Sequence, residues 1–167
     1  HAMPHLEIGE DLARAWKISI GEGSGSESKL LSRPVVVGDR LVAMDAEAGV
    51  SAFRVADGKR FWHRELTPEN EDEGVIGGGV SIDNGTVYVS TGYGFVPALS
   101  LDDGKEIWQR RIGTAIRGAP TAIGGRVFVI TYDNQLHALS SADGHTLWSH
   151  GGIPEDAGLI GAPSVAV

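Results

Sequence analysis

The chain repeats one eleven-residue pattern three times: AFRVADGKRFW at residues 52–62, ALSLDDGKEIW at 98–108 and ALSSADGHTLW at 138–148. In each copy, Asp-Gly begins five residues after a small Ala, and Trp follows five residues after the Asp. Three matches at fixed offsets are improbable by chance, and such a period marks a repeat architecture. Trp16 precedes Trp62 by 46 residues, the same gap that separates Trp62 from Trp108.

The sequence before each pattern adds two short apolar runs that are separated by a turn. The turn pairs are Gly38-Asp39, Asn84-Gly85 and Gly124-Gly125, and Gly and Asn tolerate the positive φ angles that tight hairpins require. The Asp-Gly pairs are expected to make the same kind of tight turn between the third and fourth runs. Four short antiparallel strands every 40 to 46 residues are typical of β-propeller blades, so the predicted fold class is all-β.

The repeats divide the chain into three whole blades with one extra strand at each end. The expected segments are a tag remnant and lead at 1–11, a lone outer strand at 12–20, blades at 30–66, 76–112 and 116–150, and the first strand of a fourth blade at 160–167. Three blades are fewer than the four to eight that close a propeller. We therefore expect that the remainder of a longer protein, or another chain, completes the ring.

The recurring residues have a structural interpretation. Trp is large and flat, and it is expected to fill the gap between adjacent blades opposite the small Ala52, Ala98 and Ala138. A stacking platform for a ligand is the less favoured alternative. The residues assigned to the structural repeat are Trp16, Trp62, Trp108, Trp148, Asp57, Gly58, Asp103, Gly104, Asp143 and Gly144.

Composition excludes several classes of function. The 167 residues carry a net charge of -8, so the chain lacks the basic surface that binding to nucleic acid requires. No stretch approaches the roughly 20 apolar residues that span a bilayer as a helix. The chain contains no cysteine, which excludes disulfides, thiolate metal sites and a cysteine nucleophile within it.

The search for chemistry-bearing motifs returns nothing specific. The Gly-x-Ser-x-Gly, His-Glu-x-x-His and phosphate-loop patterns are absent from the sequence. The six histidines lack the spacing of a metal site, and the acidic run at 69–73 is interpreted as a solvated loop. The glycines at 21–25 and 77–79 do not lie between a strand and a helix, which disfavours dinucleotide binding. We predict a protein that is not an enzyme and has no catalytic, cofactor-binding or metal-binding residue.

The Ala-Leu, Asp-Gly and Trp pattern resembles the repeat of pyrroloquinoline-quinone-type propellers. Within that group, the chain from Ala15 to Val167 is similar to the BamB family of outer-membrane assembly lipoproteins. The similarity includes the Ala15-Trp16 opening, Gly78-Gly79-Val80 and the run 136–139, which reads Leu-His-Ala-Leu. One departure is Val80, which stands where the other repeats have proline.

The resemblance implies an eight-bladed propeller in which the N-terminal strand supplies the outer strand of the last blade. It also implies a non-enzymatic scaffold at the periplasmic face of the outer membrane, anchored through a lipidated cysteine that this chain lacks. The implied partners are the POTRA region of BamA and unfolded outer-membrane proteins. Two alternatives stay open: a fragment of a quinone-dependent dehydrogenase, and a general propeller domain for interaction or sensing.

The connection after the third blade is the predicted partner-binding segment, with Asp156, Leu159 and Ile160 as its candidate residues. Apolar residues on loops more often serve binding than core packing. The resemblance implies that the loop at this place contacts the POTRA partner through apolar residues and a basic one. Residues 151–161 contain no Arg or Lys, so that charged contact is lost or made elsewhere. The alternative is that Leu159 and Ile160 pack under the next blade.

Overall fold

A computed structural model describes residues 14–21, 32–68 and 77–151, which contain three antiparallel four-stranded sheets. The first sheet consists of β1 (Val35–Val37), β2 (Arg40–Met44), β3 (Gly49–Arg54) and β4 (Arg60–Glu65). The second consists of β5 (Gly78–Asp83), β6 (Thr86–Thr91), β7 (Phe95–Ser100) and β8 (Glu106–Arg111). The third consists of β9 (Thr121–Ile123), β10 (Arg126–Ile130), β11 (Gln135–Ser140) and β12 (Thr146–Gly151). Consecutive strands are neighbours in every sheet, and the predicted all-β fold of four-stranded blades is confirmed.

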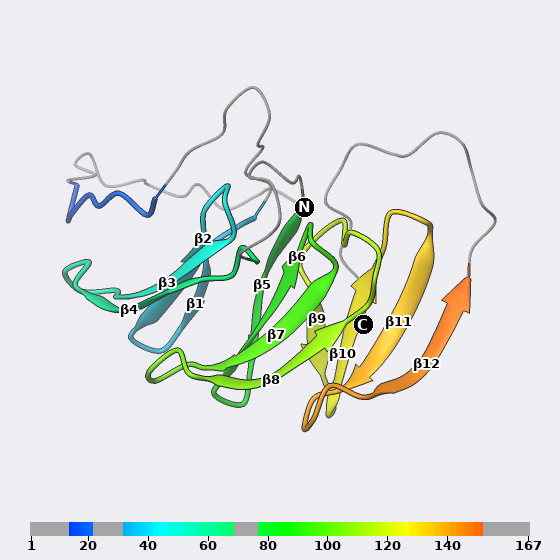
Figure 1. The fold of residues 1–167 in the computed structure, drawn as a ribbon. Helices are drawn as coiled ribbons and strands as arrows, with labels where there is room; N and C mark the ends of the chain where they lie inside the picture. Colours follow the sequence, from blue (N-terminus) through cyan, green and yellow to red (C-terminus); the bar gives the residue numbers. More distant parts are fainter. Residues whose placement is uncertain (1–13, 22–31, 69–76, 152–167) are drawn as a thin grey trace, which may run out of the picture.

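The three sheets, called blades 1, 2 and 3 in chain order, stand side by side like successive blades of a propeller (Figure 1). Their first strands are neighbours in space, because β1 contacts β5 and β5 contacts β9. The fourth strands, β4, β8 and β12, form the opposite edge of each sheet. Each blade therefore has an inner strand near its neighbours and an outer strand at the rim.

The hydrophobic core lies between the blades. One cluster of buried side chains joins blades 1 and 2 and includes Val42 and Val89. A second cluster joins blades 2 and 3 and includes Tyr88 and Val127. A single four-stranded sheet cannot bury its own apolar faces, so each blade depends on its neighbours for stability.

The first turn of each blade is a two-residue hairpin, as the sequence predicts. In blade 2, Asp83 pairs with Thr86 across Asn84 and Gly85, whose φ angles are 47° and 75°. Both angles are positive, and few residues other than Asn and Gly adopt such angles at low cost.

The Asp-Gly pairs do not make two-residue hairpins, which corrects the sequence-based prediction. β7 ends at Ser100 and β8 begins at Glu106, so a five-residue connection separates them. Gly104 donates its N–H to the carbonyl of Ser100 at 2.9 Å, and Ser100 donates to the carbonyl of Lys105 at 2.8 Å. The same two bonds recur in the turns of Gly58 and Gly144. In the wider turn the glycine lies next to the preceding blade, where a two-residue hairpin would not place it.

The turn between the second and third strands is held by one side chain in every blade. Asp45 accepts a hydrogen bond from the N–H of Gly49 at 2.7 Å. In the same way, the hydroxyl of Thr91 accepts from Phe95 at 3.1 Å, and that of Thr131 accepts from Gln135 at 3.2 Å. All three capping residues, Asp45, Thr91 and Thr131, are buried.

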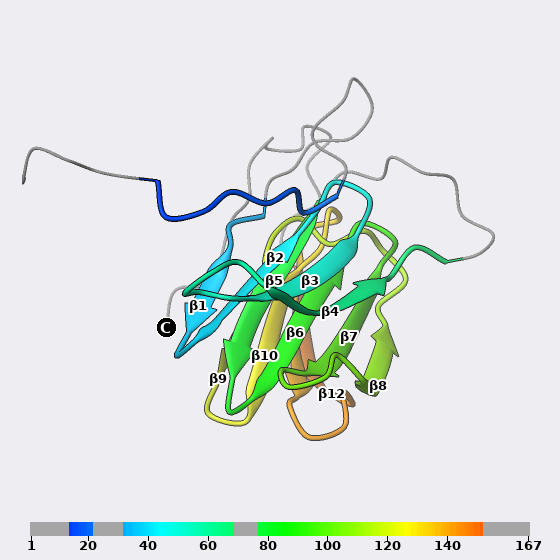
Figure 2. The same ribbon diagram turned by 90° about the vertical axis from the view of Figure 1, so that its left-hand side faces the viewer.

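The lone strand expected at 12–20 as the outer strand of a last blade stays a prediction, since its partner strands would belong to that blade. Residues 14–20 carry no strand assignment, because no neighbouring strand in the described residues forms a ladder with them. The segment 14–21, called the N-terminal strap below, instead lies across blade 1 (Figure 2). The expected lead at 1–11 and strand at 160–167 lie outside the described residues.

None of the described residues forms a helix of the length and apolarity that crossing a bilayer requires.

We predict that Thr131→Val lowers the free energy of unfolding by about 1–3 kcal/mol. Valine keeps the shape of the side chain but removes the acceptor for the N–H of Gln135. Thr86→Val, at the start of β6, is the matched control and is expected to change stability by less than about 0.5 kcal/mol. Urea denaturation measures both variants, and equal losses would contradict the capping role of Thr131.

Candidate functional site

A tryptophan of blade 1 and a tryptophan of blade 2 are each hydrogen-bonded to the next blade. The indole Nε1 of Trp62, on β4, donates to the carbonyl of Leu101 in blade 2 at 2.9 Å. Trp108, on β8, donates in the same way to Ser141 in blade 3 at 2.9 Å. Each acceptor lies in the five-residue turn that contains the Asp-Gly pair of the receiving blade. Tryptophan and turn therefore form a repeated inter-blade contact.

The glycine of each pair allows the indole ring to lie against the backbone. A Cβ atom built on Gly104 would lie 2.7 Å from the ring of Trp62, and one on Gly144 would lie 2.5 Å from the ring of Trp108. Gly104 also has a φ angle of 69°, which disfavours any side chain. The sequence predicts that Trp lies opposite Ala52 and its equivalents. Ala52 and Trp62 do pair across β3 and β4, but the ring's close inter-blade contact is the glycine.

The N-terminal strap makes the same contact with blade 1. The indole of Trp16 donates to the carbonyl of Val55 at 2.8 Å, and its ring lies over Gly58, where a Cβ would be 2.7 Å away. Trp16 therefore occupies the position that a tryptophan from a preceding blade would take. All three Asp-Gly turns among the described residues hold a tryptophan.

The aspartates of the three pairs stabilise the turns from the solvent side. Asp103 accepts a hydrogen bond from the backbone N–H of Lys105 at 3.2 Å, and the Lys105 ammonium lies 2.8 Å from its carboxylate. This contact with Lys105 is the main cause that lowers the pKa of Asp103 to about 2. Arg54 beside Asp57 and His145 beside Asp143 lower the pKa of those carboxyls to about 2 in the same way.

The outer face of blade 3 presents a tryptophan without a receiving turn. Trp148 is 44% exposed, whereas Trp62 and Trp108 are buried. Its ring lies 6.0 Å from that of Phe128, and no carbonyl of the described residues accepts its indole N–H. The three described Asp-Gly turns hold Trp16, Trp62 and Trp108, so none of them receives Trp148.

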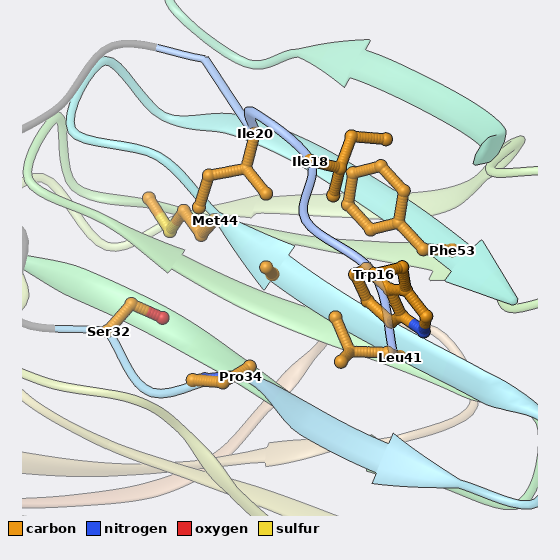
Figure 3. Close-up of a pocket in the computed structure, with 9 residues that line it drawn as sticks. Trp16, Ile18, Ile20, Ser32, Pro34, Leu41, Met44 and Phe53 are labelled. Atoms are coloured by element: carbon orange, nitrogen blue, oxygen red, sulfur yellow. The ribbon is translucent and has the colours of Figure 1, made fainter. Parts of the chain in front are cut away.

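The opposite end of the three-blade unit carries an apolar hollow of about 210 Å³ (Figure 3). Trp16, Ile18 and Ile20 of the N-terminal strap line one side of it, and Leu41 and Phe53 of blade 1 line the other. The lining offers few polar groups that would orient a polar ligand. The hollow therefore favours packing against another apolar element.

One arrangement of side chains resembles hydrolase chemistry in composition only. Ser51 lies 2.8 Å from Nδ1 of His63, and Nε2 of His63 lies 2.5 Å from Glu65. The Ser51 residue is 1% exposed, so its hydroxyl cannot reach a substrate. The three residues connect β3 to β4 and do not constitute a nucleophilic site.

No group of three or more potential metal-ligating side chains assembles within the part of the chain that the structure describes. The glycine run at 77–79 packs β5 closely against its surroundings: a Cβ on Gly79 would lie 2.8 Å from Ala119. The candidate partner-binding residues Asp156, Leu159 and Ile160, like the acidic run at 69–73, lie outside the described residues.

The sequence model of the family described as "Outer membrane protein assembly factor BamB" matches residues 8–76 and 46–167. BamB of Yersinia pestis is 28% identical over 152 residues, which cover 88% of this chain and 38% of that protein. The chain spans about a third of the length of the curated relatives it matches.

Solved propellers share the fold. The structure of BamB from Moraxella catarrhalis superposes with a TM-score of 0.62 at 22% identity, covering 73% of this chain and 36% of that one. Quinohemoprotein alcohol dehydrogenase from Comamonas testosteroni superposes with a TM-score of 0.66 at 26% identity, covering 78% of this chain and 22% of that one.

We predict that Gly104→Ala is more destabilising than Gly85→Ala. Both glycines have positive φ angles, 69° and 75°, so the backbone strain is matched. Only at Gly104 does the new methyl group meet a ring, since nothing lies within 4 Å of a Cβ on Gly85. The difference in unfolding free energy, measured with urea, is expected to be about 1–3 kcal/mol. Equal losses would contradict the steric role of the glycine.

We predict that Trp108→Ala lowers the free energy of unfolding by about 3–5 kcal/mol, as expected for a large aromatic side chain removed from a core. Trp148→Ala is the matched variant at the equivalent repeat position, and its 44% exposure predicts a smaller loss in this chain. Chemical denaturation of the two variants gives the comparison. A loss below about 1 kcal/mol for Trp108→Ala would instead indicate a ring that serves a ligand.

We predict that Asp103→Asn lowers the melting temperature at pH values where the Asp103 carboxyl is ionised. Where that carboxyl is protonated, we expect the substitution to have little effect. The folded-state pKa of Asp103 is about 2 and its ordinary value is 3.8. Its contribution is therefore present above about pH 4 and is lost as the pH falls toward about 2. Melting temperatures of wild type and variant are expected to differ most near neutral pH and to converge in acid. A constant difference across the pH range would rule out the ion pair as the cause.

Proposed function

We propose, because the chain belongs to the family of the outer membrane protein assembly factor BamB, that its blades form a non-enzymatic scaffold of the β-barrel assembly machinery. The family match along nearly the whole chain is the observation that carries this proposal. The described side chains add support, since the tryptophans repeated from blade to blade serve to join one blade to the next.

The proposed location is the periplasmic face of the outer membrane, and the proposed partner is the POTRA region of BamA. Unfolded outer-membrane proteins are the proposed cargo. The remainder of a longer protein, or another chain, would supply the turn that receives Trp148 and the blade that covers the apolar hollow under the N-terminal strap. A ring completed in this way presents its inter-blade connections as a set of neighbouring loops.

The segment after blade 3 is the proposed contact with the partner. β12 ends at Gly151, and the chain continues with Asp156, Leu159 and Ile160. Apolar side chains on such a connection are suited to a hydrophobic contact at the centre of an interface, which an acidic side chain at its edge would complete.

The test is the double substitution Leu159→Asp with Ile160→Asp in the full-length protein. Two buried carboxylates in an apolar contact are expected to reduce co-purification of BamA by an order of magnitude or more. The matched control is Ile107→Asp with Leu147→Asp, because these side chains are 53% and 42% exposed on the outer strands. If the thermal melt is preserved and BamA co-purifies undiminished, the segment is not the binding site.

A quinone-dependent dehydrogenase is the second candidate function, and the superposition on quinohemoprotein alcohol dehydrogenase favours it. Titration of the full-length protein with pyrroloquinoline quinone and calcium, followed by a dye-linked alcohol oxidation assay, separates the two. The scaffold proposal expects no turnover, and sustained alcohol oxidation would replace it.

A further inference from the structure

Arg117 is the one basic side chain that is buried among the described residues, with 5% exposure. Its Nη2 donates to the backbone carbonyl of Tyr132 at 3.1 Å, and its guanidinium carbon lies 5.3 Å from the centre of the Tyr132 ring. Its Nε is buried and has no hydrogen-bond partner. None of the ion pairs between described residues includes Arg117.

Two other arginines of the blades form ion pairs. Arg54 lies 2.6 Å from Asp57, and Arg40 lies between Asp39 and Asp102. These side chains are more exposed than Arg117, so water also solvates them. A guanidinium keeps its charge at every accessible pH, and burying it without a counter-charge is costly. The unpaired Nε of Arg117 is therefore a donor that lacks its acceptor.

The backbone holds Arg117 in place. Its N–H donates to the carbonyl of Ile130 at 2.9 Å, and the fully buried Ile116 bridges to Thr131. The carbonyl of Gly118 accepts from the hydroxyl of Ser90 at 2.6 Å. These bonds fix the residues on both sides of Arg117 between blades 2 and 3. The donor is consequently preorganised, which lowers the entropic cost of binding a ligand.

We propose that Arg117 anchors a carboxylate site at the junction of blades 2 and 3, and that an acidic side chain of the protein partner fills it. A planar guanidinium matches a carboxylate in shape and charge. Tyr132, whose ring contacts the guanidinium, is 39% exposed, so the site lies one side chain below the surface. The proposal rests on the proposed function and places a charged contact outside residues 151–161.

The test uses Arg117→Met in the full-length protein, with Arg110→Met as the matched control. Arg110 is an exposed arginine on β8, so both variants lose one positive charge. Arg117→Met is expected to change the melting temperature little, because the removal of a buried charge offsets the loss of the hydrogen bond to the carbonyl of Tyr132. It is expected to weaken binding to the isolated POTRA region by on the order of 30-fold or more, whereas Arg110→Met has little effect. Arg117→Lys lacks the guanidinium and its Nε donor, so we expect it to bind the POTRA region as weakly as Arg117→Met does.

Two results would overturn the proposal. Equal weakening of binding by Arg110→Met would show that only the loss of one positive charge matters, and not the buried position of Arg117. Wild-type affinity in Arg117→Met would show that the partner does not use Arg117.

If the unmodified protein does not bind the POTRA region, the proposed function fails and a second measurement decides the site. Acetate, compared with chloride at equal ionic strength, is expected to raise the melting temperature of wild type and Arg110→Met but not of Arg117→Met. An equal response of all three proteins would refute the carboxylate site.

Discussion

Each blade of this protein is joined to the next by an indole that lies against a glycine and donates its N–H to a nearby backbone carbonyl. The contact satisfies the one polar group of Trp while burying its large apolar surface. It requires a residue without a Cβ, because a methyl group on Gly104 would stand 2.7 Å from the ring of Trp62. The core clusters between the blades form around this contact: Trp62 and Trp108 are members of them.

The polar groups of each Asp-Gly turn lie on the side away from the indole, so the ring can lie against the glycine. The five-residue connection turns its glycine toward the preceding blade, while the aspartate beside it bonds to the backbone and to a basic side chain in solvent. The depressed pKa of these carboxyls follows from the same bonds. Asp45, Thr91 and Thr131 stabilise the opposite end of each sheet through buried hydrogen bonds. Exposed charged groups stabilise one end of each repeat, and buried side chains (the carboxyl of Asp45 and the hydroxyls of Thr91 and Thr131) stabilise the other.

The two outer faces of the three-blade unit are chemically different. At blade 1 the N-terminal strap already fills the turn with Trp16, and an apolar hollow remains beneath it. At blade 3 an exposed tryptophan lacks a turn within the described residues. Such a pair of faces suits the continuation of a propeller in one direction, which agrees with relatives that are about three times as long as this chain. The scaffold proposal agrees with this arrangement, since the repeated tryptophans serve to pack one blade against the next. Arg117 differs from them, because its Nε has no hydrogen-bond partner in the fold.

The repeat, the all-β class and the two-residue turns could be read from the sequence alone. Each depends on local backbone geometry. At Asn84-Gly85, for example, the residue types themselves predict the positive φ angles that the structure shows. Spacing also singled out Trp and Asp-Gly as the repeating residues, without showing which contacts which. The contact of Trp62 with Gly104, the burial of Arg117 and the contact of Trp16 with Gly58 became visible only in the tertiary structure. These features join segments distant in sequence or need a neighbouring strand. No local pattern specifies them, because they arise from the packing of one whole blade against the next.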